Sequence, residues 1–101
     1  MKVVLSARVE ADVARQLEYS IEHFGPAVAQ RTFDRLDKFV FRFLPDFPRA
    51  GRYLENLDLY EAWIAKTPFV IFYRVDRDGD TIAVVALFHH AQDRTAFDPD
   101  E

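Results

Sequence analysis

Residues 67–94, TPFVIFYRVDRDGDTIAVVALFHHAQDR, decide the fold because they predict two strands joined by a short polar turn. The first strand, Phe69 to Val75, is almost wholly apolar or aromatic. The Asp-Gly pair within residues 76–80 is a strong short-range hairpin pattern. The second strand, Thr81 to Phe88, is again rich in branched apolar residues, and two histidines follow it at once. An apolar hairpin of this kind delivers polar side chains to one end of a sheet, where a site is commonly built.

Upstream of this hairpin, apolar residues recur at helical spacing in two segments. The first helix is expected from Val9 to His23 or Phe24, and the second from Pro26 to about Leu44. Gly25-Pro26 joins them, because Gly suits the residue after a helix and Pro suits the first helical turn. The two apolar stripes comprise Val9, Val13, Leu17, Ile21 and Phe24 in the first helix, and Ala29, Phe33, Leu36, Val40 and Phe43 in the second.

Two further strands are expected outside the hairpin, at Lys2 to Ser6 and at Leu59 to Ala65. The segment Asp46 to Leu57 contains Pro, Gly and Asn but shows no periodicity, so it is expected to be an irregular loop. Lys66-Thr67-Pro68 is expected to turn the chain into Phe69. Consecutive strands joined by short turns predict an antiparallel meander.

The resulting order of strand, helix, helix and three strands (β-α-α-β-β-β) predicts the fold class α+β. We expect a two-layer sandwich, with a helical hairpin packed on a small, mainly antiparallel sheet. A length of 101 residues suggests a single domain, residues 1–101. Its acidic end, residues 96–101, is expected to be a frayed tail.

Composition limits the possible functions. Half of the residues are hydrophobic, and ten are Phe. A domain of this size buries only about 60–70% of its unfolded surface, so some of the Phe side chains should meet a partner. The net charge of −4 counts against a general nucleic-acid binder, and no strong direct nucleic-acid binding is expected. The chain has no Cys, no secretory signal pattern and no run long enough to span a membrane, so a cytoplasmic location is expected.

The two histidines after the last strand have two interpretations. His90 could act as a general acid, because His titrates near neutral pH. Alternatively, one of the pair packs at the end of the sheet and the other is solvated. A metal site formed by His89, His90 and Asp93 is disfavoured, since adjacent strand residues point to opposite faces.

Three arginines and the one Trp also have alternative roles. Arg74 could meet a carboxylate of a partner protein, or lie at an edge or solvent-facing position opposite Tyr73. Arg49 and Arg52 could contact DNA or a target protein, or cap the second helix, whose C-terminus favours cations. Trp63 is expected to pack in the core or on a sheet face.

Phe39, Phe41 and Phe43 lie close together at the end of the second helix. Phe39 and Phe43 are four residues apart and share a face, whereas Phe41 points elsewhere. At least one of the three is therefore expected to face outward in an isolated monomer. A partner helix or strand that covers it is a natural explanation.

Two long runs of the chain carry a family pattern. The first contains Ser6, Ala11-Asp12, Tyr19, Ile21, Ala29 and, after the second helix, Leu44-x-x-Phe47-Pro48-x-x-Gly51-Arg52. The second is FVIFYRVDRDGDTIAVVALFHHAQDR, an aromatic strand, an acidic-Gly turn and a Val/Leu-rich strand that ends in His. In order and spacing, from roughly residue 3 to residue 95, these runs resemble the ParE/RelE toxin superfamily. The resemblance implies a toxin that is neutralised by a small antitoxin encoded beside it.

The superfamily has two main activities. RelE-like members resemble ribosome-dependent mRNA endonucleases, and cleavage needs cations for the scissile phosphate together with an acid and a base. Where the resemblance leads us to expect an Arg, a second basic residue and a Tyr, this chain has Val70, Ala91 and Phe97. ParE-like members are generally described as poisons of DNA gyrase that need no catalytic set of their own. The resemblance therefore favours the ParE-like branch, with the antitoxin and DNA gyrase as partners.

These inferences define two sets of candidate residues and leave alternatives open. We expect no cofactor, no metal and no membrane contact, and His90 is the only candidate for a catalytic residue. The target-binding candidates are Arg49, Arg52, His89, His90 and Arg94. The antitoxin-binding candidates are Phe39, Phe41, Phe43 and Arg74. The alternatives to a gyrase poison are a RelE-like mRNA endonuclease and a non-toxic module that only binds the antitoxin.

Overall fold

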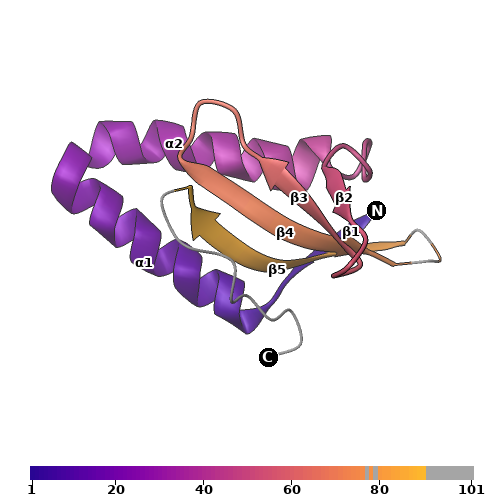
Figure 1. The fold of residues 1–101 in the computed structure, drawn as a ribbon. Helices are drawn as coiled ribbons and strands as arrows, with labels where there is room; N and C mark the ends of the chain where they lie inside the picture. The colour runs from indigo at the N-terminus through magenta and orange to yellow at the C-terminus, as the bar shows by residue number, and fades with distance from the viewer. Residues whose placement is uncertain (77, 79, 91–101) are drawn as a thin grey trace.

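The computed structural model describes residues 1–76, 78 and 80–90, which form two helices, one π-helical turn and a five-stranded sheet (Figure 1). The expected tail at residues 96–101 lies outside the described residues. The elements are β1 (Lys2–Leu5), α1 (Ala7–Phe24), α2 (Pro26–Lys38), the π-helical turn η1 (Phe39–Phe43), β2 (Arg52–Leu54), β3 (Leu59–Trp63), β4 (Phe69–Val75) and β5 (Thr81–His89).

The sheet has the order β1-β5-β4-β3-β2, so the predicted hairpin of β4 and β5 forms its centre. β1 runs parallel to β5, and all the other neighbours are antiparallel. The α+β two-layer architecture expected from the sequence is therefore confirmed. Among the described residues, no helix is long and apolar enough to cross a bilayer.

The segment Asp46 to Leu57 is not wholly irregular, as the sequence had indicated, because it contains β2. This strand is only three residues long, and it pairs Arg52 with Glu61 and Leu54 with Leu59. Three residues are too few to show an alternating pattern, so the sheet has one more strand than expected. The second helix also differs, since its α-helical part ends at Lys38 and one π-helical turn follows.

Local sequence explains the boundaries of the helices. Ser6 caps α1, and its hydroxyl oxygen accepts a hydrogen bond from the backbone N–H of Val9 (3.1 Å). Gly25 ends α1 at a φ of 84°, a backbone conformation that residues with a side chain rarely adopt. Pro26 then occupies the first turn of α2, where its missing N–H costs no helical hydrogen bond.

Both helices pack on one face of the sheet, which we call the inner face. The main core lies between these two layers and includes Val9, Leu36 and Val40 from the helical layer. The predicted stripes are only partly buried, because Ile21, Phe24 and Phe43 are exposed. The first two lie near the helix connection, which extends past the ends of the central strands (Figure 1).

The opposite face, the outer face, carries a second apolar cluster. Its buried members are Leu59, Val70, Phe72 and Ala86, all from strands. No described helix covers this face. Alternation along β4 explains the division, since Val70 and Phe72 point outward whereas Ile71 points into the main core.

A β-bulge in β5 changes which of its residues face inward. Phe72 pairs with Ala86 but Tyr73 pairs with Val84, so Val85 is one extra residue in β5. Beyond the bulge the alternation is shifted by one position. His89 consequently faces the helices, whereas a regular strand would have turned it outward.

The motif residue Gly51 is held close to β4 by a buried hydroxyl. The Tyr73 hydroxyl oxygen accepts a hydrogen bond from the backbone N–H of Gly51 (2.9 Å). A Cβ atom at Gly51 would lie 2.8 Å from the carbonyl oxygen of Glu61 and 3.0 Å from the Tyr73 hydroxyl. Glycine is therefore required here by lack of space.

Replacing Tyr73 with Phe should lower the free energy of unfolding by about 1 kcal/mol, because the N–H of Gly51 loses its acceptor. Tyr60 is a matched control, since its ring stacks on that of Tyr73 (5.3 Å) and its hydroxyl makes no hydrogen bond within the described part of the chain. Urea denaturation of Tyr73→Phe and Tyr60→Phe measures the difference. Equal stability of the two variants would contradict this account.

Candidate interaction site

An exposed aromatic cluster lies at the end of the second helix. The ring of Phe43 stacks on that of Phe39 (5.3 Å between centroids) and lies 4.9 Å from that of Phe47. We call these three residues the aromatic ladder; they are spaced four residues apart along the helix end and the turn after it. Phe39 packs against the main core, whereas Phe43 and Phe47 are exposed. The ladder thus connects the core to the surface.

An open hollow of about 490 Å³ lies beside the ladder, at the end of the sheet where β4 finishes and β1 starts. Its lining is mainly apolar and has one cation and one acid. The lining residues are Met1, Phe43, Phe47, Pro48, Arg49, Ala50, Val75 and Asp76. A hollow of this size can accept one or two large apolar side chains of a partner.

The predicted antitoxin-binding residues do not form one surface. Phe41 and Phe43 are exposed, at 47% and 42%, as expected for at least one of the three Phe residues. Phe39 is half-buried against the core. Arg74 lies apart from them on the outer side of β4 and is half-buried. Of the two positions expected for Arg74, the edge is excluded because β4 is the central strand, whereas its half-buried place on the outer face agrees with the solvent-facing alternative.

The predicted target-binding residues are also dispersed. Arg49 lines the hollow with Val75 at one end of β4, whereas His89 pairs with Phe69 at the other end. These ends are six residues apart, or roughly 20 Å at the rise of a β-strand. One phosphate group cannot contact both positions. Arg94, the last member of this set, lies outside the described residues.

Arg52 is paired within the sheet. Its guanidinium contacts the Glu61 carboxylate (3.3 Å), which also accepts a hydrogen bond from Trp63 Nε1 (3.3 Å). Arg52 therefore does not cap the second helix, and Arg49 makes no side-chain hydrogen bond or ion pair with the described residues. Trp63 lies on the outer sheet face and is 57% exposed, so the core position considered for it is wrong.

The two histidine rings stack on each other, with 4.7 Å between their centroids. This differs from the expectation of opposite faces, because β5 ends at His89 and His90 belongs to the following turn. The backbone N–H of His90 donates to the carbonyl oxygen of Pro68 (2.7 Å). His89 lies edge-on to the ring of Phe69 (6.3 Å).

His89 lines a second cavity of about 220 Å³ under the helix connection. The other lining residues are Gln16, Tyr19, Ser20, Phe24, Val28, Thr32, Pro68 and Phe69. Burial lowers the pKa of His89 below its usual value, and the charge of His90 adds to this effect. Within the described residues, no group of three His, Cys, Asp or Glu side chains could hold a metal ion. Asp93, named above as a potential ligand, is outside the described residues.

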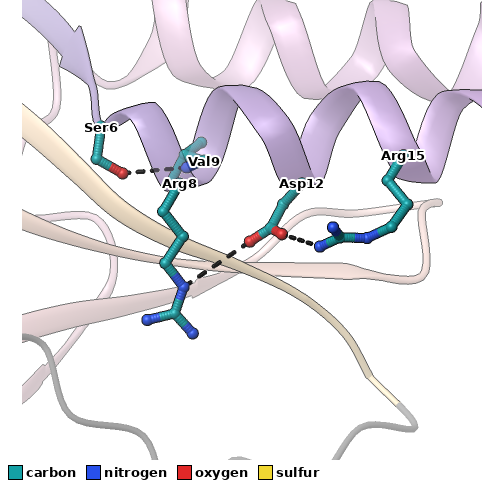
Figure 2. A network of polar contacts seen from close by, with 5 residues as sticks. All are labelled: Ser6, Arg8, Val9, Asp12 and Arg15. Atoms are coloured by element: carbon teal, nitrogen blue, oxygen red, sulfur yellow. Dashed lines mark hydrogen bonds and ion pairs between the residues drawn. The ribbon is translucent and has the colours of Figure 1, made fainter. Parts of the chain in front are cut away.

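The start of α1 contains a charge cluster that sequence reasoning missed. Figure 2 shows Asp12 between two arginines, with an ion pair to Arg15 and a longer one to Arg8 (4.0 Å). Arg8 also lies over the ring of Phe88, 5.9 Å from its centroid. The spacing of these charges by three and four residues in a helix could have revealed the pairs. The side chains of Arg8 and Arg15 are exposed to solvent, so each ion pair contributes little to the stability of the fold.

Comparison with known protein families identifies the family of this chain. The family described as "ParE toxin of type II toxin-antitoxin system, parDE" matches residues 3–94. The chain belongs to the ParE toxin family. Among curated protein sequences, no significant match to this ParE-family chain is found.

Two solved structures share the fold of this ParE-family chain at low sequence identity. One, titled "Chromosomal ParDE TA system from P. aeruginosa", is 17% identical with a TM-score of 0.69 and covers 88% of this chain and 95% of that one. The other is titled as the toxin–antitoxin complex RelBE2 from Mycobacterium tuberculosis. It is 19% identical with a TM-score of 0.61, and it covers 87% of this chain and 95% of that one. These likenesses show the fold, and the family match confirms the superfamily expected from the sequence.

The lowered pKa of His89 predicts a loss of stability in acid. Because the folded state binds this proton less readily than the unfolded state, stability should fall as the pH decreases through the ordinary His range near 6.5. His89→Asn should lose less stability than the native ParE-family chain between pH 7.5 and pH 5.5. Urea denaturation at the two pH values measures this, with His23→Asn, an exposed helix position, as the control. A pH effect that is unchanged in His89→Asn would contradict the assignment.

Proposed function

We propose that this chain is a toxin that binds DNA gyrase and holds it in its cleaved-DNA state, and that a cognate antitoxin neutralises it. Membership of the ParE toxin family supports the toxin role and the antitoxin partner. In this mechanism the breaks are made by gyrase itself. The chain therefore needs a binding surface and no catalytic residues.

The dispersion of the candidate cations is the observation that favours binding over RNA cleavage. An endonuclease must gather cations and proton-transfer groups around one phosphate. Here Arg49 and the histidines lie at opposite ends of β4, and Arg52 contacts Glu61. Val70, at the position where the resemblance implies an Arg, is buried in the outer apolar cluster.

A supercoiling assay with purified protein tests the gyrase target. The chain should inhibit gyrase and increase the amount of cleaved DNA trapped in the complex. Unchanged supercoiling together with cleavage of ribosome-bound mRNA would replace the proposal with the RelE-like activity. Normal growth of cells that express the chain without an antitoxin would instead favour a non-toxic antitoxin-binding module.

The exposed side chain of Phe41 should contribute to antitoxin binding. Phe41→Ser should weaken binding of the co-expressed antitoxin by about tenfold, since an aromatic anchor at an interface carries 1 kcal/mol or more. Ile21→Ser is a matched control, because Ile21 is similarly exposed (43%) but lies on α1. Both variants should keep nearly native stability. Isothermal titration calorimetry compares them, and equal affinities would remove Phe41 from the interface.

A further inference from the structure

The cavity under the helix connection contains a buried polar group without a described partner. Ser20 lines this cavity from α1 and is only 8% exposed. Its hydroxyl makes no hydrogen bond with residues 1–76, 78 and 80–90. Most buried hydroxyl groups in proteins have a hydrogen-bond partner, because an unpaired one has lost its bonds to water without replacement. The missing partner of Ser20 is therefore a group that enters the cavity.

The rest of the cavity wall is mainly apolar. Phe69, at the start of β4, is buried, whereas Phe24 at the end of α1 and Val28 in α2 are exposed. The cavity is therefore enclosed by both helices and the sheet, and it opens to solvent beside the two exposed side chains. An apolar cavity of about 150 Å³ holds benzene. The volume here is about 220 Å³, so there is room for a molecule with one or two aromatic rings.

The polar groups of the wall indicate an uncharged ligand. Gln16 and Thr32 are half-buried, and their side chains make no hydrogen bond within the described part of the chain. None of the described lining residues is Asp, Glu, Lys or Arg. His89 is mainly neutral at pH 7, because burial lowers its pKa. A charged ligand would lose its hydration here without gaining an opposite charge.

We propose that this cavity binds a small, uncharged aromatic molecule that carries a hydrogen-bonding group. The rings of the ligand lie against Phe69 and the other apolar side chains, and its polar group bonds to the Ser20 hydroxyl. Apolar walls with a few well-placed polar groups are typical of small-molecule sites. The cavity is separate from the hollow beside the aromatic ladder, because Phe69 and Val75 are the two ends of β4. Binding of this ligand does not depend on the proposed gyrase target.

Indole and indole-3-carboxylate are matched probes, since they share the same two rings and only the second carries a charge. Indole should bind the native chain with a dissociation constant on the order of 1 mM or lower, which is within reach of a ligand of this size. The carboxylate should bind about tenfold or more weakly. Titration of the isotope-labelled chain, followed by nuclear magnetic resonance, measures both affinities. The amide shifts caused by indole should be largest at Ser20, Phe69 and His89.

Two substitutions of Ser20 show whether the probe is bound in this cavity. Ser20→Ala removes the hydroxyl and should weaken indole binding about threefold or more. Ser20→Leu fills the cavity and should abolish binding. Ile21→Ala is the control and should bind as the native chain does, because Ile21 is exposed and does not line the cavity. Circular dichroism checks that the three variants fold.

Urea denaturation in the absence of ligand tests whether the Ser20 hydroxyl is unpaired in the free chain. Ser20→Ala should have a denaturation midpoint equal to or above the native one, because it removes an unsatisfied buried polar group. Ser6→Ala should have a lower midpoint, since the Ser6 hydroxyl accepts the N–H of Val9. A lowered midpoint for Ser20→Ala would show that the hydroxyl already has a partner and would overturn the proposal.

Three further results would overturn the proposal. The first is the absence of indole binding to the native chain at millimolar concentration. The second is binding that Ser20→Leu leaves unchanged, because the probe would then lie elsewhere. Equal affinity for indole-3-carboxylate is the third, since it would exclude an uncharged ligand class. If the native chain does not bind indole and Ser20→Leu loses gyrase inhibition, the cavity belongs to a side chain of a protein partner instead.

Discussion

The burial of β4 on both faces is the constraint on which the rest of the structure depends. Ile71 and Tyr73 belong to the core under the helices, whereas Val70 and Phe72 belong to the cluster on the outer face. A strand that is apolar on both sides must lie at the centre of a sheet with apolar neighbours on each flank. β5 and β3 meet this requirement, and the helical layer then needs only to cover one face.

This central burial leaves few positions for charge. Arg74 is the one charged residue in β4, and the other candidate cations among the described residues lie at the ends or the edge of the sheet. Exposed apolar side chains gather in two places, around the helix connection and at the aromatic ladder with the hollow beside it. Apolar surface at the margin of a layer is suited to binding another chain. It is poorly suited to holding a phosphate in place for cleavage.

Secondary-structure elements with a strong local sequence pattern could be predicted from the sequence. The two helices, their junction at Gly25-Pro26 and the central hairpin follow from periodicity and turn chemistry alone, and the structure confirms them. β2 could not be predicted, because its pairing with β3 is a tertiary contact of three residues. The stacking of the two histidines depends on where β5 ends, and local sequence does not determine that point. The separation of Arg49, Arg52 and Arg74 from one another likewise depends on the order of the strands in the sheet.

The extra residue in β5 determines how the strand responds to a change in its length. N-terminal to Val85, the residues that face inward are the even-numbered Ile82 and Val84. C-terminal to it, they are the odd-numbered Leu87 and His89. The alternation of inward and outward residues therefore differs between the two halves of the strand. Deleting the extra residue, Val85, would remove the bulge and leave Leu87 and His89 on the inner face. Deleting a residue within either half would instead turn part of that half to the opposite face. The strand is therefore more sensitive to a change of length away from Val85 than to conservative substitution.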